Sequence, residues 1–309
     1  IDGAKNWIKW THGYPTVSTI DLKIHPREHD LVIGTFGRAA YVLDDIRPLR
    51  ALAAEGTGIL NNHLYFFQPP TAVLAIHRQA SGTRFNANAM FSGENRDGGA
   101  MISFIYNPPK DKQEGKSKPS KSEGKRPGKS DVRPKKDKVK IEILNAKNDV
   151  IRTLQVEAES GFNRTMWGLR RKGVRSAGGR GWGGQMRQDQ EPPGPPVLPG
   201  DYTVRMSHAK DTVSQMVNVI TDPRVDIYSR NLEELQPLYD RQMELAELTG
   251  KALKQLREAK ETIGSVNKLL NPKQDKDHKE LKTLGKDAQE KIDELEKLIV
   301  NPRGRQGIS

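Results

Sequence analysis

Residues 24–45 constrain the fold more than any other stretch of the chain. A turn signal at residues 25–30 precedes the apolar run 31–33, and glycines at 34 and 37 precede a second apolar run at 41–43. Short apolar runs bounded by turn residues are typical of hairpin strands. Residues 17–24 alternate with period two and add a third strand. Three short strands in a meander are the size of one β-propeller blade, which cannot bury its apolar faces alone. The sequence therefore predicts neighbouring sheets that this chain does not contain.

Composition limits how much of the chain can form a packed core. The 309 residues are enough for two or three compact units, but only 34% of them are hydrophobic. More than half of the net charge of +12 comes from residues 110–138, where ten Lys and two Arg face five acidic residues. Cysteine is absent, which excludes disulfides and Cys-ligated metals. No apolar run approaches the roughly 20 residues that span a membrane.

The middle of the chain is expected to be a second β domain. We expect residues 1–48 to form the terminal blade of a truncated propeller, 49–62 a linker, and 63–225 the β domain. Strict alternation at 139–143 predicts a half-buried strand. The Lys-rich insert 108–138 has almost no apolar residues and is expected to be disordered. The Gly- and Pro-rich segment 172–196 is expected to be a second mobile loop.

Towards the C-terminus the apolar spacing changes to three and four residues. This spacing runs from about residue 231 to 270, stops at Asn271-Pro272, and resumes from 281 to 298. It predicts an antiparallel helical hairpin over residues 228–300. Residues 301–309 are expected to be a truncated tail. The predicted class is therefore mainly β with an α C-terminus.

The N-terminal motifs resemble those of a known family. Asp2 and Trp7 fit the end of an Asp-box, Ser-x-Asp-x-Gly-x-x-Trp, with Ala4 in place of its glycine. The segments 14–17 and 25–45 resemble a hallmark of bacterial sortilin/Vps10-like BNR-repeat propeller proteins, which are often labelled glycosyl hydrolases. Phe36, Ala39 and Tyr41 depart from the family's His, Gly and Trp.

A second part of the chain carries the same resemblance. Residues 161–170 and 198–204 match motifs of the β-sandwich that follows the propeller in that family, which implies an immunoglobulin- or fibronectin-III-like sandwich over 63–225. The resemblance implies a structural role for its motif residues, because short turn motifs of this type mostly fix geometry. These residues are Asp2, Trp7, His25, Pro26, Arg27, Gly34, Gly37, Arg38, Asp44, Asp45, Asn163, Arg164, Trp167, Pro199, Gly200 and Tyr202.

No pattern in the sequence specifies catalysis. The seven His lack zinc-site spacing, and neither Gly-x-Ser-x-Gly nor a P-loop occurs. Asp21 with Asp44-Asp45 could be considered a glycosidase carboxylate pair, but Asp44-Asp45 falls at a strand end, where turn and capping roles dominate. Asn163-Arg164-Thr165 fits the glycosylation triplet, yet Asn163 belongs to a structural motif. We expect no catalytic residue, no cofactor and no metal in this chain.

The expected function is therefore non-catalytic. We expect the C-terminal binding and scaffolding region of a secreted, periplasmic or cell-surface sortilin/Vps10-like propeller protein. Its partners would be the upstream propeller blades and a protein, peptide or glycan. The alternative is an accessory region of a glycoside-hydrolase-like, sialidase-type enzyme whose active site lies in missing blades. A nucleic-acid role for the Lys-rich insert is a third reading, although residues 110–138 contain no aromatic side chain for base stacking.

Overall fold

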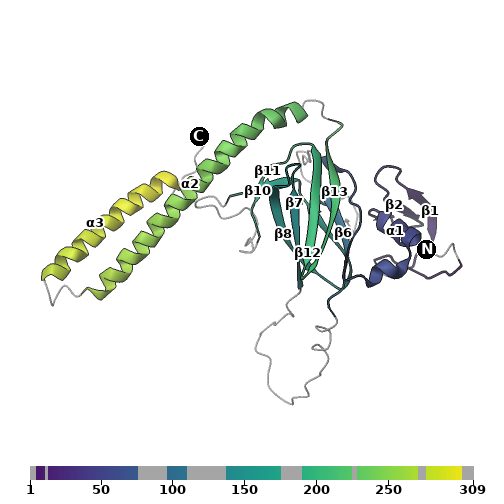
Figure 1. The fold of residues 1–309 in the computed structure, drawn as a ribbon, viewed down its shortest axis with the longest axis horizontal. Helices are drawn as coiled ribbons and strands as arrows, with labels where there is room; N and C mark the ends of the chain where they lie inside the picture. Colours follow the sequence, from purple (N-terminus) through teal and green to yellow (C-terminus); the bar gives the residue numbers. More distant parts are fainter. Residues whose placement is uncertain are drawn as a thin grey trace, which may run out of the picture. The chain divides into compact units, whose positions relative to one another are not determined.

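The computed structural model describes residues 5–10, 13–75, 96–109, 137–174, 190–224, 228–270 and 276–300. The chain is mainly β with a C-terminal helical part, as the sequence predicts (Figure 1). It divides into two compact units. The first comprises residues 1–170 and 197–229, and the second comprises 171–196 and 230–309.

A three-stranded antiparallel meander opens the first unit and confirms the predicted strands. It consists of β1 (Thr19–Ile24), β2 (Leu31–Thr35) and β3 (Ala40–Leu43), in the order β1–β2–β3. Leu22 and Ile24 of β1 lie on one face of this sheet and are 55% and 47% exposed, and Ile20, which lies at a β-bulge between Thr19 and Asp21, is 68% exposed. Trp7 of the Asp-box motif lies outside any strand and is 87% exposed. Asp2 lies outside the described residues.

The expected linker contains two short helices. Helix α1 (Arg47–Glu55) starts with Pro48 in its first turn, where proline's missing N–H costs no helical hydrogen bond. The 3₁₀ helix η1 (Thr57–Asn61) follows Gly56, whose φ is +87°. These helices lead directly into the first strand of the next domain.

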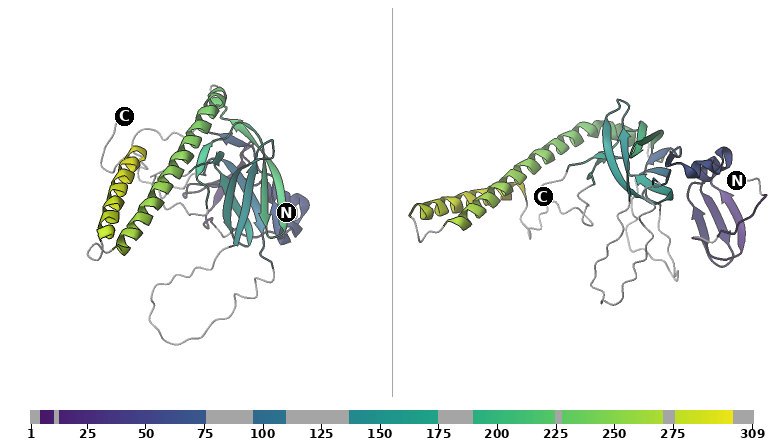
Figure 2. Two further views of the ribbon diagram at one scale, coloured as in Figure 1. Left: turned by 60° about the vertical axis from the view of Figure 1, so that its left-hand side comes forward. Right: turned by 60° about the horizontal axis from the view of Figure 1, so that its bottom comes forward.

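Two sheets form the larger β domain of the first unit (Figure 2). The three-stranded sheet has the order β4–β6–β9 and the five-stranded sheet the order β5–β13–β12–β7–β8. Strands β5 and β13 are parallel, whereas the other recorded pairs in these sheets are antiparallel. The strands are β4 (Leu64–Phe66), β5 (Ala72–Leu74), β6 (Ala100–Tyr106), β7 (Asp137–Leu144), β8 (Val150–Ala158), β9 (Gly161–Trp167), β12 (Gly200–His208) and β13 (Asp211–Thr221).

The core of this domain lies around β6, which is buried along its whole length. Opposite it, Val139, Ile141 and Ile143 of β7 are fully buried, which confirms the half-buried strand predicted from their alternation. Val204 and Met206 of β12 are also fully buried. Apolar burial of this extent is the main favourable term for such a domain.

The two expected inserts lie largely outside the described residues, namely 110–136 and 175–189. The ends of the second insert are ordered, because β10 (Arg170–Lys172) and β11 (Pro193–Pro196) pair in a two-stranded sheet. The sequence predicts a mobile loop over residues 172–196, and the pairing of its two ends corrects that prediction. Gly173 and Gly194 permit the pairing, since a Cβ on Gly173 would lie 2.5 Å from the Pro193 carbonyl oxygen.

The second unit contains the predicted helical hairpin. Helix α2 (Tyr228–Leu269) and helix α3 (Lys276–Ile299) run side by side (Figures 1 and 2). Arg257 pairs with Glu296, and Lys260 pairs with Asp293. Within the described part of the chain, neither helix is apolar over a length that would cross a membrane.

Candidate functional site

The loop between β1 and β2 is tied together by its own backbone and by His25. The N–H of His25 donates to the Asp30 carbonyl at 2.8 Å, and the N–H of His29 donates to the His25 carbonyl at 2.9 Å. The Glu28 N–H donates to Nδ1 of His25 at 3.0 Å, so this nitrogen acts as the acceptor. His25 therefore serves as a turn residue.

The turn after β3 docks onto this loop. Asp45 is 5% exposed with a φ of +48°. Its N–H donates to Oδ1 of Asp30 at 2.9 Å, and the Ile46 N–H donates to the His29 carbonyl at 3.0 Å. Nε of Arg47 donates to Oδ1 of Asp45 at 2.5 Å. The two turns at this end of the sheet are thus locked to each other.

Arg164 of β9 connects the two-sheet domain to the turn after β3. Its Nη1 donates to the Asp44 carbonyl at 2.8 Å and its Nη2 to the Asp45 carbonyl at 3.2 Å, while Nε donates to Oγ of buried Ser103 at 3.1 Å. Burial lowers the pKa of the guanidinium, against the opposing charges of Asp45 and Asp44. A half-buried cation with all three nitrogen atoms engaged fixes geometry rather than reacting.

A second arginine, Arg96, reaches the same turns. It donates to both carboxylate oxygens of Asp30, at 3.2 and 3.4 Å, and to Oε2 of Glu28 at 3.4 Å. Partial burial acts to raise the pKa of Glu28, but the hydrogen bond and charge of Arg27, followed by Arg96, hold it below its ordinary value. We call Arg96 and Arg164, with Glu28, Asp30, Asp44 and Asp45, the arginine clasp.

Other motif residues lie near the clasp without joining it. Gly37 has a φ of +76° and Ala39 a φ of +61°, so both adopt the left-handed conformation. Gly34 lies in β2 opposite Ala40, and a Cβ there would meet Asp21 only at ordinary contact distance. Arg38 is exposed, and Arg27 bonds its neighbour Glu28. Pro26 lies within the His25 turn.

The remaining motif residues brace the two-sheet domain. Asn163 accepts from the Glu159 N–H and donates from Nδ2 to the Glu159 and Gly161 carbonyls, so its amide is fully used by the β8–β9 turn. Trp167 is 1% exposed, packs edge-on against Tyr202, and donates from Nε1 to the Arg170 carbonyl. The Tyr202 hydroxyl donates to the Leu198 carbonyl at 2.8 Å, across the Pro199-Gly200 turn.

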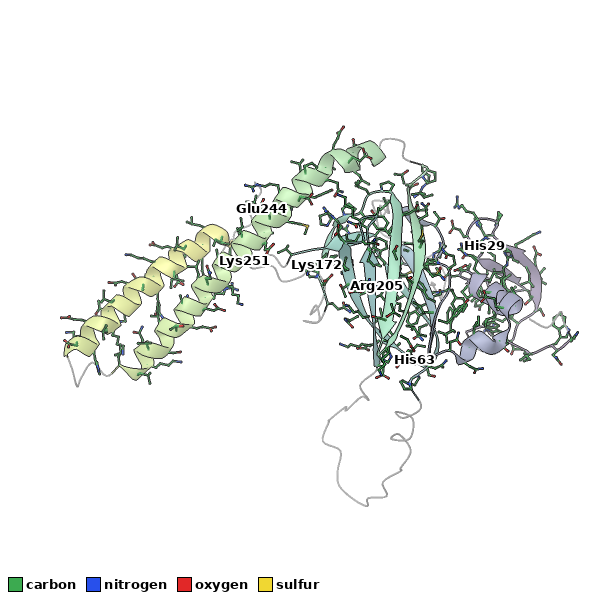
Figure 3. The ribbon with its side chains drawn as sticks, viewed as in Figure 1. His29, His63, Lys172, Arg205, Glu244 and Lys251 are labelled. Carbon is green, nitrogen blue, oxygen red and sulfur yellow. The ribbon has the colours of Figure 1, made fainter. Side chains whose placement is uncertain are left out.

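A second polar cluster lies at the end of the two-sheet domain that carries His63 (Figure 3). Nδ1 of His63 donates to the Asn107 carbonyl, 2.5 Å away, and Nε2 of His63 shares a hydrogen bond with Nδ1 of His208 at 3.0 Å. The Tyr106 hydroxyl donates to Oδ2 of Asp137 at 2.8 Å. Burial, with this bond, raises the pKa of Tyr106, so it remains a donor at neutral pH.

Comparison with protein-family models, curated proteins and solved structures found no match. The function proposed below is therefore based on the sequence and geometry of the chain. Within the described ranges, no group of three or more His, Asp or Glu side chains could hold a metal ion. The arginine clasp is the site with the greatest structural consequence, because it joins two separate sheets.

The sequence pointed to only part of the clasp. It singled out Asp44, Asp45 and Arg164, and the structure brings them together. It did not single out Arg96, Glu28 or Asp30, although Glu28 and Asp30 stand inside the motif at 25–45. Arg96 follows a stretch outside the described residues, and no local pattern marks it as a partner of residues more than sixty positions earlier. The His63–His208 pair also has no sequence signal, because 145 positions separate its members.

Proposed function

We propose that this chain is a non-catalytic binding and scaffolding region, the C-terminal part of a secreted or envelope-associated sortilin/Vps10-like propeller protein. In this proposal β1–β3 belongs to the last blade of the ring. The two-sheet domain is an immunoglobulin-like module that supports the blade, and protein, peptide or glycan partners bind to the whole.

The exposed apolar face of the three-stranded sheet carries the proposal. Leu22 and Ile24 lie at alternate positions of β1 on one face and are each about half exposed, and Ile20 at the preceding bulge is 68% exposed. Monomeric soluble proteins rarely leave such a contiguous apolar surface in water unless it is an interaction site. A neighbouring blade is the partner that this face would bury in a propeller.

The arginine clasp supports a scaffolding role. Arg96 and Arg164 come from the two-sheet domain, whereas their acceptors come from the turns that flank β2 and β3. Hydrogen bonds to charged groups contribute about 1.5–3 kcal/mol each when partly buried. A blade held by these hydrogen bonds would move together with the domain that follows it.

The strand order supports the immunoglobulin-like reading of the two-sheet domain. If β4, β6 and β9 correspond to strands A, B and E, then β13, β12, β7 and β8 correspond to G, F, C and C′. Tyr202 near the start of β12 donates to a carbonyl four residues upstream, as the tyrosine corner of such domains does. The buried Trp167 packs against this tyrosine.

A binding experiment tests the proposal. The polypeptide encoded immediately before Ile1 in the gene is expected to bind this chain, as measured by isothermal titration calorimetry. Leu22→Lys should weaken that binding at least tenfold, because a charge would enter the blade contact. Lys23→Gln, on the opposite face of β1, serves as the matched control and should bind like the unmodified chain.

Two outcomes would contradict the proposal. The first is a gene without blade-like sequence before Ile1, and the second is binding that Leu22→Lys leaves unchanged. Hydrolysis of aryl glycosides by the joined polypeptide would instead support the glycoside-hydrolase alternative.

A further inference from the structure

The side of α2 that faces α3 is not its most apolar side. The residues of α2 that meet α3 include Lys260, which pairs with Asp293, and Asn267, which lies against Gly285. Leu253, which is 3% exposed, lies on the same side of the helix, because it precedes Lys260 by seven residues and Asn267 by fourteen. At about 100° per residue these positions point in one direction.

A separate apolar line runs along α2, rotated by about 100° from the first. It follows a heptad pattern at residues 238, 245, 252, 256, 259, 263 and 266, all apolar, with Leu248 beside it. Leu238, Leu245, Leu248 and Val266 are 64%, 46%, 54% and 49% exposed. The first half of the heptad line and Val266 are therefore uncovered, whereas Ala252, Leu256 and Ile263 are partly covered.

Helix α3 has the same arrangement. Ile292 is 8% exposed, whereas Leu284, Leu295 and Leu298 are 63%, 48% and 83% exposed. About the axis of α3, these leucines are rotated from the side that faces α2. The rotation has the same sense, viewed from the N-terminus of each helix, as that of the heptad line about the axis of α2. Because the helices are antiparallel, equal rotations bring both apolar lines to the same side of the hairpin. The hairpin thus has one apolar face, with a groove between α2 and α3.

Only half of α2 has α3 beside it. The contacts of Arg257 with Glu296, Lys260 with Asp293 and Gly264 with Gln289 set the register, so α3 ends level with about residue 254 of α2. Leu238, Leu245 and Leu248 lie beyond that end. The apolar face of the hairpin therefore has two parts. Along the second half of α2 it is a groove between α2 and α3, and along the first half of α2 it is a ridge of leucines.

The two halves of α2 carry opposite charge. Residues 228–250 contain five acidic and two basic side chains, whereas residues 251–270 contain five basic and two acidic ones. Figure 3 labels Glu244 and Lys251, on either side of this boundary. Two α2 helices lying antiparallel would place each acidic half beside a basic half.

We propose that two copies of this chain associate through antiparallel α2 helices. The leucine ridge of each copy, residues 235–250, fills the groove between α2 and α3 of the other. Each end of the contact is then a three-helix bundle, and the two-fold axis passes near residue 252. This isologous arrangement covers the leucines of both halves at once. A pairing of α2 with the partner's α3 would leave the ridge leucines in water, because α3 does not extend that far.

Charge and size favour a second copy over other occupants. The two helices carry nearly balanced charge, unlike the basic helices that bind anionic membranes or nucleic acids. The heptad line from residue 235 to 270 is about 50 Å long, and a strip one helix wide covers about 600 Å² per copy. With the leucines of α3 this approaches the roughly 800 Å² that each partner of a standard interface buries.

The oligomeric state of the full chain tests the proposal. Light scattering coupled to size exclusion should give twice the 34.6 kDa of one chain at about 10 µM protein, and dilution should reverse it. Leu245→Lys should weaken dimerisation at least tenfold without loss of helicity by circular dichroism, because its site is exposed in one copy. Ser265→Lys, on the far side of α2, is the control and should leave the dimer intact.

A chain that stays monomeric at 100 µM would overturn the proposal, as would a Leu245→Lys variant that dimerises normally. A monomer that binds phosphatidylglycerol vesicles would overturn it in favour of a membrane.

Engineered cysteines test the orientation, because the chain has none of its own. Ala252→Cys lies near the proposed two-fold axis and should form a disulfide between copies under mild oxidation. Val266→Cys would lie far from its counterpart in an antiparallel pair and should remain reduced. Cross-linking of both variants would indicate a parallel pair and overturn the proposed arrangement, and cross-linking of neither would overturn the α2 contact.

Discussion

At the scale of single residues, Gly99 has the least room for a Cβ among the glycines that the structure describes. Its φ is +131°, and a Cβ would lie 2.2 Å from the Trp167 carbonyl oxygen, which is backbone and cannot move aside cheaply. Gly99→Ala should lower the free energy of unfolding by about 3 kcal/mol or more. Gly58, with ordinary φ and open space around its Cβ, is the matched control. Gly58→Ala should be neutral or slightly stabilising in the same urea titration.

Ala39 should respond in the opposite direction. It adopts a φ of +61°, where an L side chain is strained and glycine is not. Ala39→Gly should therefore raise stability by up to about 1 kcal/mol, after the entropy cost of glycine is subtracted. Thermal melting of the two proteins would measure the difference. A lower melting temperature for the glycine variant would contradict the strained geometry at this turn.

Glu28 gives the arginine clasp a dependence on pH. Its pKa is depressed in the folded chain, so its contribution to stability is present above the unfolded value near 4.3 and is lost as pH falls through the lower folded value. Amide exchange in β1–β3 should therefore accelerate below about pH 4. Glu28→Gln should exchange faster at pH 7 and lose part of this acid dependence. An unchanged pH profile in that variant would remove Glu28 as a cause.

At the scale of elements, the clasp determines whether the three-stranded sheet stays docked. Removal of the Arg164 guanidinium, as in Arg164→Met, leaves the Asp44 and Asp45 carbonyls without these donors and should destabilise the docked sheet by about 2–3 kcal/mol. Hydrogen exchange should rise in β2 and β3 while the β6 core keeps its protection. Arg241→Met, which breaks an exposed ion pair with Glu244, should change stability by less than about 1 kcal/mol. Equal effects of the two variants would mean that the clasp is only a surface contact.

At the scale of the whole molecule, the two compact units should unfold separately. Among the described residues of α2 and α3, the buried apolar side chains are Leu232, Leu253 and Ile292, whereas the two-sheet domain buries the whole of β6. Ellipticity at 222 nm, dominated by the helices, should therefore decrease at a lower temperature than the near-ultraviolet signal of Trp167. If α2 pairs between copies, only the helical transition should shift with protein concentration. A single coincident transition would contradict this separation.

The sequence alone determined the meander, the strand β7 and the two C-terminal helices, and the order in which they occur. Period-two alternation located β1 and β7, short apolar runs located β2 and β3, and spacing of three and four residues located both helices, because these patterns are local. Turn residues marked the ends of β2 and β3 for the same reason. The ends of the 172–196 segment escaped prediction, since their pairing depends on two glycines that allow distant backbones to approach.

Only the tertiary structure decided which of these residues meet. Arg96 and Arg164 reach acceptors 66 to 120 positions away, and His63 meets His208 across 145. Such contacts are set by the pairing and stacking of sheets, which no local pattern encodes. The hairpin gives a similar case. Its leucines predicted two amphipathic helices, but only the packing of α2 on α3 determined that the most apolar sides of both lie beside the contact, on the same side of the hairpin.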